Sequence, residues 1–214
     1  MMKSTIALQL RSLWAGFRAM IIITAFVSLV YTGALTAIGQ FAFNEKANGS
    51  MIEGNSGEAV GSKYIGQSFT DARGVALKRY FQSRPSATLG SDGESSPYDG
   101  AASLGSNLGA SNADLVKVIK ERKAAVAKLE GVSIDDVPAD AVTASASGLD
   151  YQISTAYAQI QIRRVAEARG LDTAAVRKLV DRYTTHRGLG FIGEPGVNIV
   201  ELNAALDRAD ATVH

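Results

Sequence analysis

The stretch AMIIITAFVSLVYTGALTAIGQFAF, residues 19–43, is a run of 25 residues without a charged side chain. A helix needs about 20 apolar residues to cross the hydrocarbon core of a bilayer, so this run is long enough to span one with some tilt. A secretory signal has a shorter apolar region and a small-x-small cleavage site, and the possible site at Leu35-Thr-Ala37 has a large residue at its first position. We therefore expect an uncleaved transmembrane helix over residues 19–43, with a cleaved signal as the alternative.

The charges around this run predict its orientation. Lys3, Arg11 and Arg18 precede it with no acidic residue, whereas Glu45 and Lys46 nearly cancel after it. Because basic residues favour the cytoplasmic side, we expect residues 1–18 to be cytoplasmic and the chain beyond residue 43 to be extracytoplasmic. That part keeps 19 of the 22 basic and all 21 acidic residues, which is the balance of a soluble domain.

The predicted helix carries a polar pattern that points to a protein partner. Small and hydroxyl side chains let helices approach closely in lipid and form hydrogen bonds between them, although Ser and Thr can also bond to their own backbone. We expect helix association through this stripe. Its members are Thr24, Ser28, Thr32, Gly33, Thr36 and Gln40, with Gly33-x-x-x-Ala37 beside it.

The remaining chain reads as a linker over residues 44–60 and one extracytoplasmic α+β domain over 61–214. Tyr80-Phe81 before Arg84-Pro85 indicates a strand that passes into an extended loop, and residues 88–111 are rich in loop-forming residues. Three helices are expected at about 113–130, 155–169 and 173–187. Their N-caps are Ser111 or Asn112, Ser154 and Asp172, and a glycine ends each one. A short strand around Val197 and Ile199 and a final helical segment over 202–208 follow.

The composition excludes several kinds of site. The chain has no cysteine, which removes disulfides, thiolate metal sites and cysteine nucleophiles. Its net charge of +1 and scattered basic residues do not suggest nucleic-acid binding. The two histidines, His186 and His214, form no metal-binding pair. We expect no metal site, and we interpret His186 as the positive end of a helix rather than as the base of a hydrolase.

The loop LGSNLGASNADL, residues 104–115, has the glycines of a phosphate-binding loop but not its spacing. A P-loop places Lys and Ser/Thr directly after its glycines, and here the next lysine is Lys117. Helix capping is therefore the favoured interpretation. Asn107, Ser111 and Asn112 stay as weak candidates for nucleotide binding.

Two carboxylates and one guanidinium lie near a polar turn. Asp140 and Asp150 flank residues 143–149, where a pair could do acid–base work, but a turn-and-cap network is the favoured interpretation. Arg84 beside Pro85 either binds an anion or pairs with the loop backbone. We identify no catalytic residue.

From residue 61 onward the motifs together resemble the KdpC family, whose members are subunits of the Kdp-type potassium-transporting ATPase. The matching stretches are GSKYIGQSF (61–69), YFQSRPSA (80–87), SNLG (106–109), VTASASGLD (142–150), RVAEARGL (164–171) and LGFIGEP (189–195). The chain departs from the family pattern at Ala110 and Ala113, where Pro is usual, at Ala146, where Gly is usual, and at Tyr151-Gln152, where Pro-His is usual.

The resemblance implies a non-catalytic accessory subunit of a potassium importer in the bacterial inner membrane. The implied partners are a channel-like potassium-binding subunit, a P-type ATP-splitting subunit and a small single-span subunit. The family is described as a chaperone that raises the ATP affinity of the catalytic subunit. No cofactor is expected to bind firmly, and ATP is expected to act through the complex. The alternatives are a domain that binds ATP directly and, ranked last, a membrane-anchored hydrolase.

Overall fold

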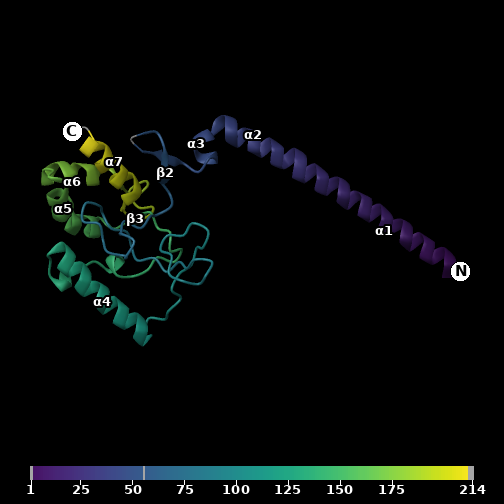
Figure 1. The fold of residues 1–214 in the computed structure, drawn as a ribbon. Coiled ribbons are helices and arrows are strands. Elements are labelled where there is room, and N and C mark those ends of the chain that lie inside the picture. Colours follow the sequence, from purple (N-terminus) through teal and green to yellow (C-terminus); the bar gives the residue numbers. More distant parts are fainter. Residues whose placement is uncertain (1, 55, 212–214) are drawn as a thin grey trace. The chain divides into compact units, whose positions relative to one another are not determined.

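The computed structural model describes residues 2–54 and 56–211. The chain divides into two compact units, one up to Ser50 and one from Met51 onward. The first unit holds an apolar helix and the second mixes helices with short strands, which confirms the α+β class (Figure 1).

The N-terminal unit is dominated by one long helix. It comprises α1 (Met2–Ala25), a π-helical turn η1 (Phe26–Tyr31) and α2 (Thr32–Ala42), and the short helix α3 (Asn44–Ala47) follows. Gln9–Ala42 is long and apolar enough to span a membrane, and it is the one such helix among the described residues. The helix thus begins earlier than the predicted span of residues 19–43, and no proline interrupts residues 2–18.

The second unit begins with an antiparallel hairpin of β1 (Met51–Glu53) and β2 (Ala59–Ser62). The predicted linker over residues 44–60 therefore contains α3, β1 and the start of β2, so the compact domain starts before the expected residue 61. Gly54 and Gly57 supply the turn, where Gly57 has a φ of 81°. Such a backbone favours glycine, and composition alone made this segment look like a linker.

The segment at Tyr80-Phe81 is not a strand, contrary to the sequence prediction. Phe81 is fully buried, but its backbone groups bond to a side chain: its N–H donates to Asn203 Oδ1 at 2.9 Å, and its carbonyl accepts from Asn203 Nδ2 at 2.9 Å. The next N–H, of Gln82, donates to Gln161 Oε1 at 2.6 Å. Amide side chains on two helices take the place of a neighbouring strand.

Two helices match their predicted bounds. The helix α4 (Ala113–Glu130) is capped by Asn112, and Gly131 ends it with a φ of 65°. The helix α5 (Thr155–Arg169) is capped by the Ser154 hydroxyl and ends at Gly170. Residues 88–111 contain no helix or strand, as predicted.

The third helix is shorter than predicted. The helix α6 (Thr173–Arg182) begins at its expected cap, Asp172, but it ends five residues before Arg187. Thr184–Thr185 instead form β4, which pairs with β5 (Gly196–Asn198). Two consecutive β-branched residues favour an extended backbone, and a partner strand further along the chain stabilises it.

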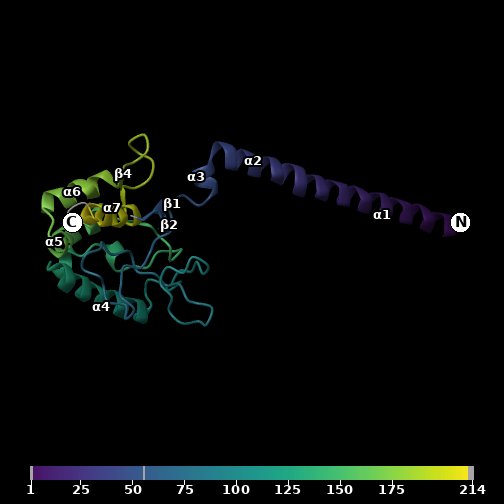
Figure 2. The same cartoon turned by 45° about the horizontal axis from the view of Figure 1, so that its top comes forward.

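The domain core lies between the helices and a small sheet. The sheet has the order β3-β5-β4, with β3 (Gln152–Ile153) and β4 both antiparallel to β5. The final helix α7 (Ile199–Ala211) follows β5 directly and is longer than the predicted segment 202–208. Figures 1 and 2 agree in placing α5, α6 and α7 close together, with α4 on the far side of α5 from α6. The fully buried side chains from these elements include Ile162, Val165, Val176, Val197, Leu202 and Leu206.

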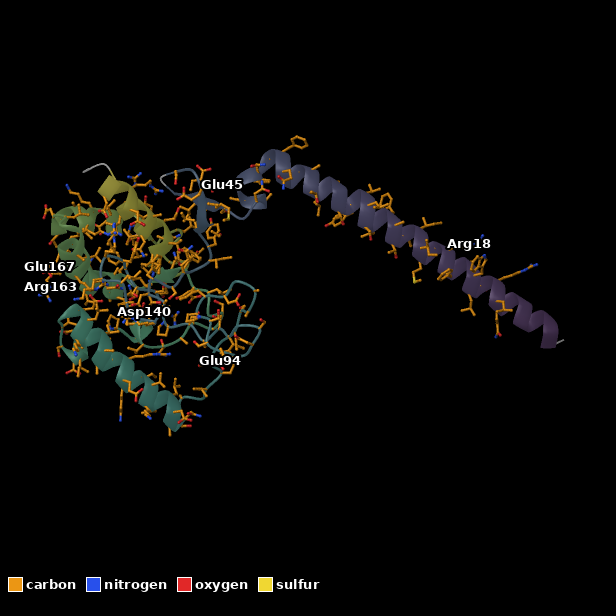
Figure 3. The ribbon with its side chains drawn as sticks, viewed as in Figure 1. Arg18, Glu45, Glu94, Asp140, Arg163 and Glu167 are labelled. Atoms are coloured by element: carbon orange, nitrogen blue, oxygen red, sulfur yellow. The ribbon has the colours of Figure 1, made fainter. Side chains whose placement is uncertain are left out.

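Polar contacts join α4 to α5. The Arg163 Nη2 donates to the carbonyls of Glu130 and Gly131 at 3.0 and 3.3 Å, at the negative end of the α4 dipole. Figure 3 shows Arg163 beside Glu167 at the edge of the domain. Arg164, the next residue, points inward and forms a buried ion pair with Glu130 at 2.9 Å.

Candidate functional site

The polar stripe of the apolar helix is exposed along its whole length in the N-terminal unit. Its side chains are all exposed in the N-terminal unit, and a Cβ added at Gly33 would meet no atom within 4 Å. Thr32 Oγ1 donates to the Val27 carbonyl at 3.3 Å, so at least one hydroxyl is partly satisfied by its own backbone. Gln40 bonds to Asn44 and Asn48. The stripe positions therefore lie as predicted on one helix, and their contact with another protein stays a prediction.

The π-helical turn changes how the stripe runs along the helix. In an α-helix four residues exceed a full turn by about 40°, so residues spaced by four rotate steadily around the axis. In a π-helix, with its i to i+5 bonds, four residues fall short of a full turn. The turn at Phe26–Tyr31 includes Ser28. It rotates the stripe backwards between Thr24 and Thr32, and thereby keeps the polar side chains closer to one face.

The loop 104–115 is shaped by packing and capping. Asn112 Oδ1 accepts from the N–H groups of Asp114 and Leu115 at 2.8 and 3.2 Å, which confirms its role as a cap. A Cβ at Gly105 would lie 2.7 Å from the Ala146 carbonyl oxygen, so glycine is needed where the loop meets the 143–149 turn. Asn107 has a φ of 51° and donates to the Gly105 carbonyl at 3.1 Å. Ser111 is exposed.

These three nucleotide candidates do not line the cavity of about 480 Å³ that lies beside α4. Asn112 is committed to the helix end, and the amide of Asn107 is used within its own loop. Nucleotide binding by Asn107, Ser111 and Asn112 stays a prediction.

Arg84, Asp140 and Asp150 come together around one cavity of about 330 Å³. Arg84 Nη1 donates to Asp150 Oδ2 at 2.8 Å, across 66 residues of sequence. Asp140 accepts from both the N–H and the hydroxyl of Ser154, at 2.7 and 2.8 Å, and so fixes the N-cap of α5. Figure 3 shows Asp140 among the packed side chains of the domain. Both carboxylates are engaged, as the predicted turn-and-cap network requires.

The departure at Tyr151-Gln152 lies at the edge of this cavity. Tyr151 packs edge-on against Tyr64 with a ring-centroid distance of 5.5 Å. Gln152, in β3, donates to Thr185 Oγ1 at 3.4 Å and so links β3 to β4. Both side chains are thus engaged in contacts within the domain.

His186 does not end a helix, contrary to the prediction. It follows β4, in an exposed loop, because α6 ends at Arg182. The dipole interpretation of His186 is therefore wrong. His214 lies outside the described residues. Among residues 2–54 and 56–211, no group of three or more His, Asp or Glu side chains could hold a metal ion.

An exposed apolar loop follows His186. Leu189, Phe191 and Ile192 are 84%, 75% and 56% exposed, and the first two are the most exposed large apolar side chains in the described part of the domain. Gly188 and Ile192 close the loop through paired backbone hydrogen bonds of 2.8 Å, and Arg187 pairs with Glu194 at 2.8 Å. Our sequence reasoning did not select these residues as an interface. The apolar side chains of this glycine-rich loop are the sequence feature that could have indicated an interface.

Comparison with known proteins gives one consistent family. The model of the family described as "KdpC: K+-transporting ATPase, c chain" matches residues 13–208. A potassium-transporting ATPase KdpC subunit of Streptomyces avermitilis is 42% identical and covers 99% of this chain and 100% of its own length. The corresponding protein of Mycobacterium bovis is 43% identical over 92% of this chain and 98% of its own. That of an Enterobacter species is 49% identical over 87% and 92%.

Proposed function

The chain belongs to the KdpC family of K+-transporting ATPase subunits, and from this premise we propose that it is a non-catalytic accessory subunit of a potassium-importing complex. The names of its relatives make them subunits of such an ATPase, and the described residues offer no catalytic constellation. The chain also lacks the Asp-Lys-Thr-Gly sequence that P-type pumps phosphorylate. Its contribution is therefore to assembly and to the conformation of the complex.

The observation that carries this proposal is the polar stripe on a helix of membrane-spanning length. Exposed hydroxyl and amide side chains are unfavourable against lipid, and a second helix can satisfy them. The backward rotation at the π-turn keeps them near one face, as a single packing partner requires. The channel-like potassium-binding subunit is the partner we assign to this face, with the ATP-splitting and small single-span subunits completing the complex.

The domain is assigned to the extracytoplasmic side by the charges before the helix. Lys3, Arg11 and Arg18 precede the apolar run without an acidic neighbour. An alkaline phosphatase fused to the C-terminus should be active in cells of the expressing bacterium. A cytoplasmic reporter at the same position should be inactive, and the reverse result would place the domain inside.

Support for ATP use is then indirect. ATP is cytoplasmic, whereas the assigned position of the domain is extracytoplasmic. A subunit that binds one conformation of a pump more tightly shifts the population towards that conformation. If this conformation also binds ATP more tightly, the subunit raises ATP affinity without touching the nucleotide.

Direct nucleotide binding is the alternative function. The full chain would then bind ATP in detergent, and changes at Asn107 or Ser111 would abolish the binding. The indirect account predicts no measurable binding at millimolar ATP.

Assembly itself is tested by affinity purification of the tagged full chain from native membranes in mild detergent. The proposal predicts recovery of a pump subunit and a pore subunit in stoichiometric amounts. A stable monomer under the same conditions would contradict it. Leu189 and Phe191 are the most exposed large apolar side chains in the described part of the domain. A Leu189→Ser/Phe191→Ser double variant should therefore weaken this recovery if their loop also contacts a partner.

A further inference from the structure

An open cavity of the domain is lined by loop residues, by one face of α4 and by Tyr157 of α5. Its volume is about 480 Å³, which is within the range of small-molecule sites. One wall is apolar, formed by Phe69, Val126, Leu129 and the ring of Tyr157. The lining also includes residues 82–86 and Pro97-Tyr98. All of these elements belong to the second unit.

The charged side chains that line this cavity are both arginines. Arg84 comes from the loop after Phe81 and Arg122 from α4, and no Asp or Glu is part of the lining. Arg122 Nη1 donates to the Val142 carbonyl at 3.2 Å, and Arg84 Nη2 lies 3.5 Å from the carbonyls of Thr143 and Ala144. Because the two guanidinium groups bond to the carbonyls of three consecutive residues, 142–144, their positive charges lie close to one another.

These two partly buried guanidinium groups have fewer charged partners than the guanidinium groups of Arg164 and Arg169, whose side chains are buried. Arg164 is paired with Glu130, and Arg169 with Asp207 and Asp210. Arg122, by contrast, has no ion pair among the described residues, and burial lowers its pKa. Arg84 pairs with Asp150 through Nη1 only, while its buried Nε has no hydrogen-bond partner. An unsatisfied buried donor on a charged group is costly, and a bound acceptor removes that cost.

We propose that this cavity binds a small amphipathic anion, a carboxylate or a phosphate ester that carries an apolar group. The anionic oxygens accept from Arg84 and Arg122, and the apolar group lies against Phe69, Val126 and Leu129. Arginine suits this task because its planar donors match both carboxylate and phosphate. The cavity shares no residue with the helix stripe. A result against anion binding would therefore leave the proposed assembly role unchanged, and a result against assembly would leave the anion site unchanged.

The test uses the full chain in nanodiscs of neutral lipid, with fluorinated probes followed by fluorine NMR. The probes are para-fluorobenzoate, para-fluorophenyl phosphate and the neutral para-fluorobenzamide. At least one anion should bind saturably with one site per chain, and at least tenfold more tightly than the amide. Arg84→Gln and Arg122→Gln should each weaken the anion at least tenfold, while Arg182→Gln, an exposed arginine outside the cavity, should leave it unchanged.

A second variant keeps the test decisive if loss of a guanidinium disturbs folding. Ala125 lines the cavity from the exposed side of α4, so Ala125→Trp fills the space without removing a charge or a helix bond. It should abolish anion binding and leave the circular dichroism unchanged. Anion binding that survives Ala125→Trp, binding of the amide as tight as that of the anions, or no anion binding at tenfold probe excess up to millimolar concentration would each overturn the proposal.

The source of the anion is resolved by changing the lipid. If phosphatidylglycerol nanodiscs suppress probe binding relative to phosphatidylcholine nanodiscs, a bilayer lipid headgroup occupies the site. If binding is equal in both, the natural ligand is a soluble anion. Both results support the shared chemistry.

Discussion

Arg164 is the residue at which three parts of the domain meet. It lies on α5, pairs with the buried Glu130 of α4 at 2.9 Å, and donates through Nη1 to the carbonyls of Lys78 and Tyr80. Its Nη2 donates to Gln161 Oε1 at 2.8 Å, the same oxygen that accepts from the Gln82 N–H. One cation therefore holds the irregular segment before the Arg84 loop against two helices.

Loss of Arg164 should destabilise the domain strongly. Arg164→Leu leaves the Glu130 carboxylate, which is fully buried, without its partner. Removal of one member of a buried pair costs about 3–5 kcal/mol of unfolding free energy. Urea unfolding of the full chain in detergent, followed by circular dichroism, measures this loss. Arg182→Leu is the exposed control and should stay within about 0.5 kcal/mol of the parent; equal effects of the two changes would refute the role of Arg164.

Ionisation of Tyr98 lowers the unfolding free energy of the domain at alkaline pH. Its hydroxyl donates to the Arg84 carbonyl at 2.7 Å, and burial raises its pKa to about 12. This folded-state pKa lies above the unfolded value near 10, so the protonated phenol stabilises the fold fully below pH 10. That contribution is lost as the pH rises through about 12.

The Tyr98→Phe variant isolates this effect. Between pH 9 and pH 12, the unfolding free energy of the parent should fall by about 2 kcal/mol more than that of the variant. The comparison cancels the other tyrosines, which both proteins keep. Parallel pH profiles for the two proteins would show that the Tyr98 hydroxyl is not buried as described.

Among the elements, the helices that carry their own boundaries were predictable. The ends of α4 and α5 depend on caps and glycines within two residues of the helix, so sequence alone identifies them. The end of α6 depends on the pairing of Thr184 with Val197, and the Phe81 segment depends on Asn203, 122 residues away. A local stretch of sequence does not indicate partners that lie so far away along the chain.

The start of α4 allows the capping interpretation of the 104–115 loop to be measured. Asn112→Ala removes an acceptor for two helix N–H groups and should lower the unfolding free energy by about 1 kcal/mol. Ser111→Ala, at the exposed neighbouring position, should change it by less than about 0.5 kcal/mol. Urea unfolding of both variants decides between them, and a larger effect at Ser111 would shift the cap to that residue.

The stripe predicts that only one face of the membrane helix contacts the partner subunits. Gly33→Leu places a large side chain beside Thr32 and Thr36 and should reduce recovery of the partner subunits at least tenfold. Ala34→Leu introduces the same side chain in the same turn, about 200° from Thr32 around the axis, and should leave recovery unchanged. Quantitative affinity purification of both variants measures the difference. Equal recovery would mean that the stripe faces lipid.

For the whole molecule, the sequence was informative where a feature is continuous along the chain. A single apolar run and a series of family motifs were enough to expect one membrane-length helix, an α+β domain and membership of an ATPase subunit family. The convergence of Arg84 and Arg122 on the 142–144 carbonyls was not predictable, because it joins a loop, a helix and a turn that are 20 to 60 residues apart. The proposed anion cavity is likewise formed by residues that are far apart in the sequence.

In the proposed assembly the apolar helix is an interface rather than a plain anchor. The most direct test replaces residues 19–43 by an equally long run of alternating Leu and Ala in the tagged full chain, with the flanking charges kept. The domain should stay folded and membrane-bound, but the pump and pore subunits should no longer co-purify with it. If the replaced helix still recovers both subunits in stoichiometric amounts, the central claim is contradicted.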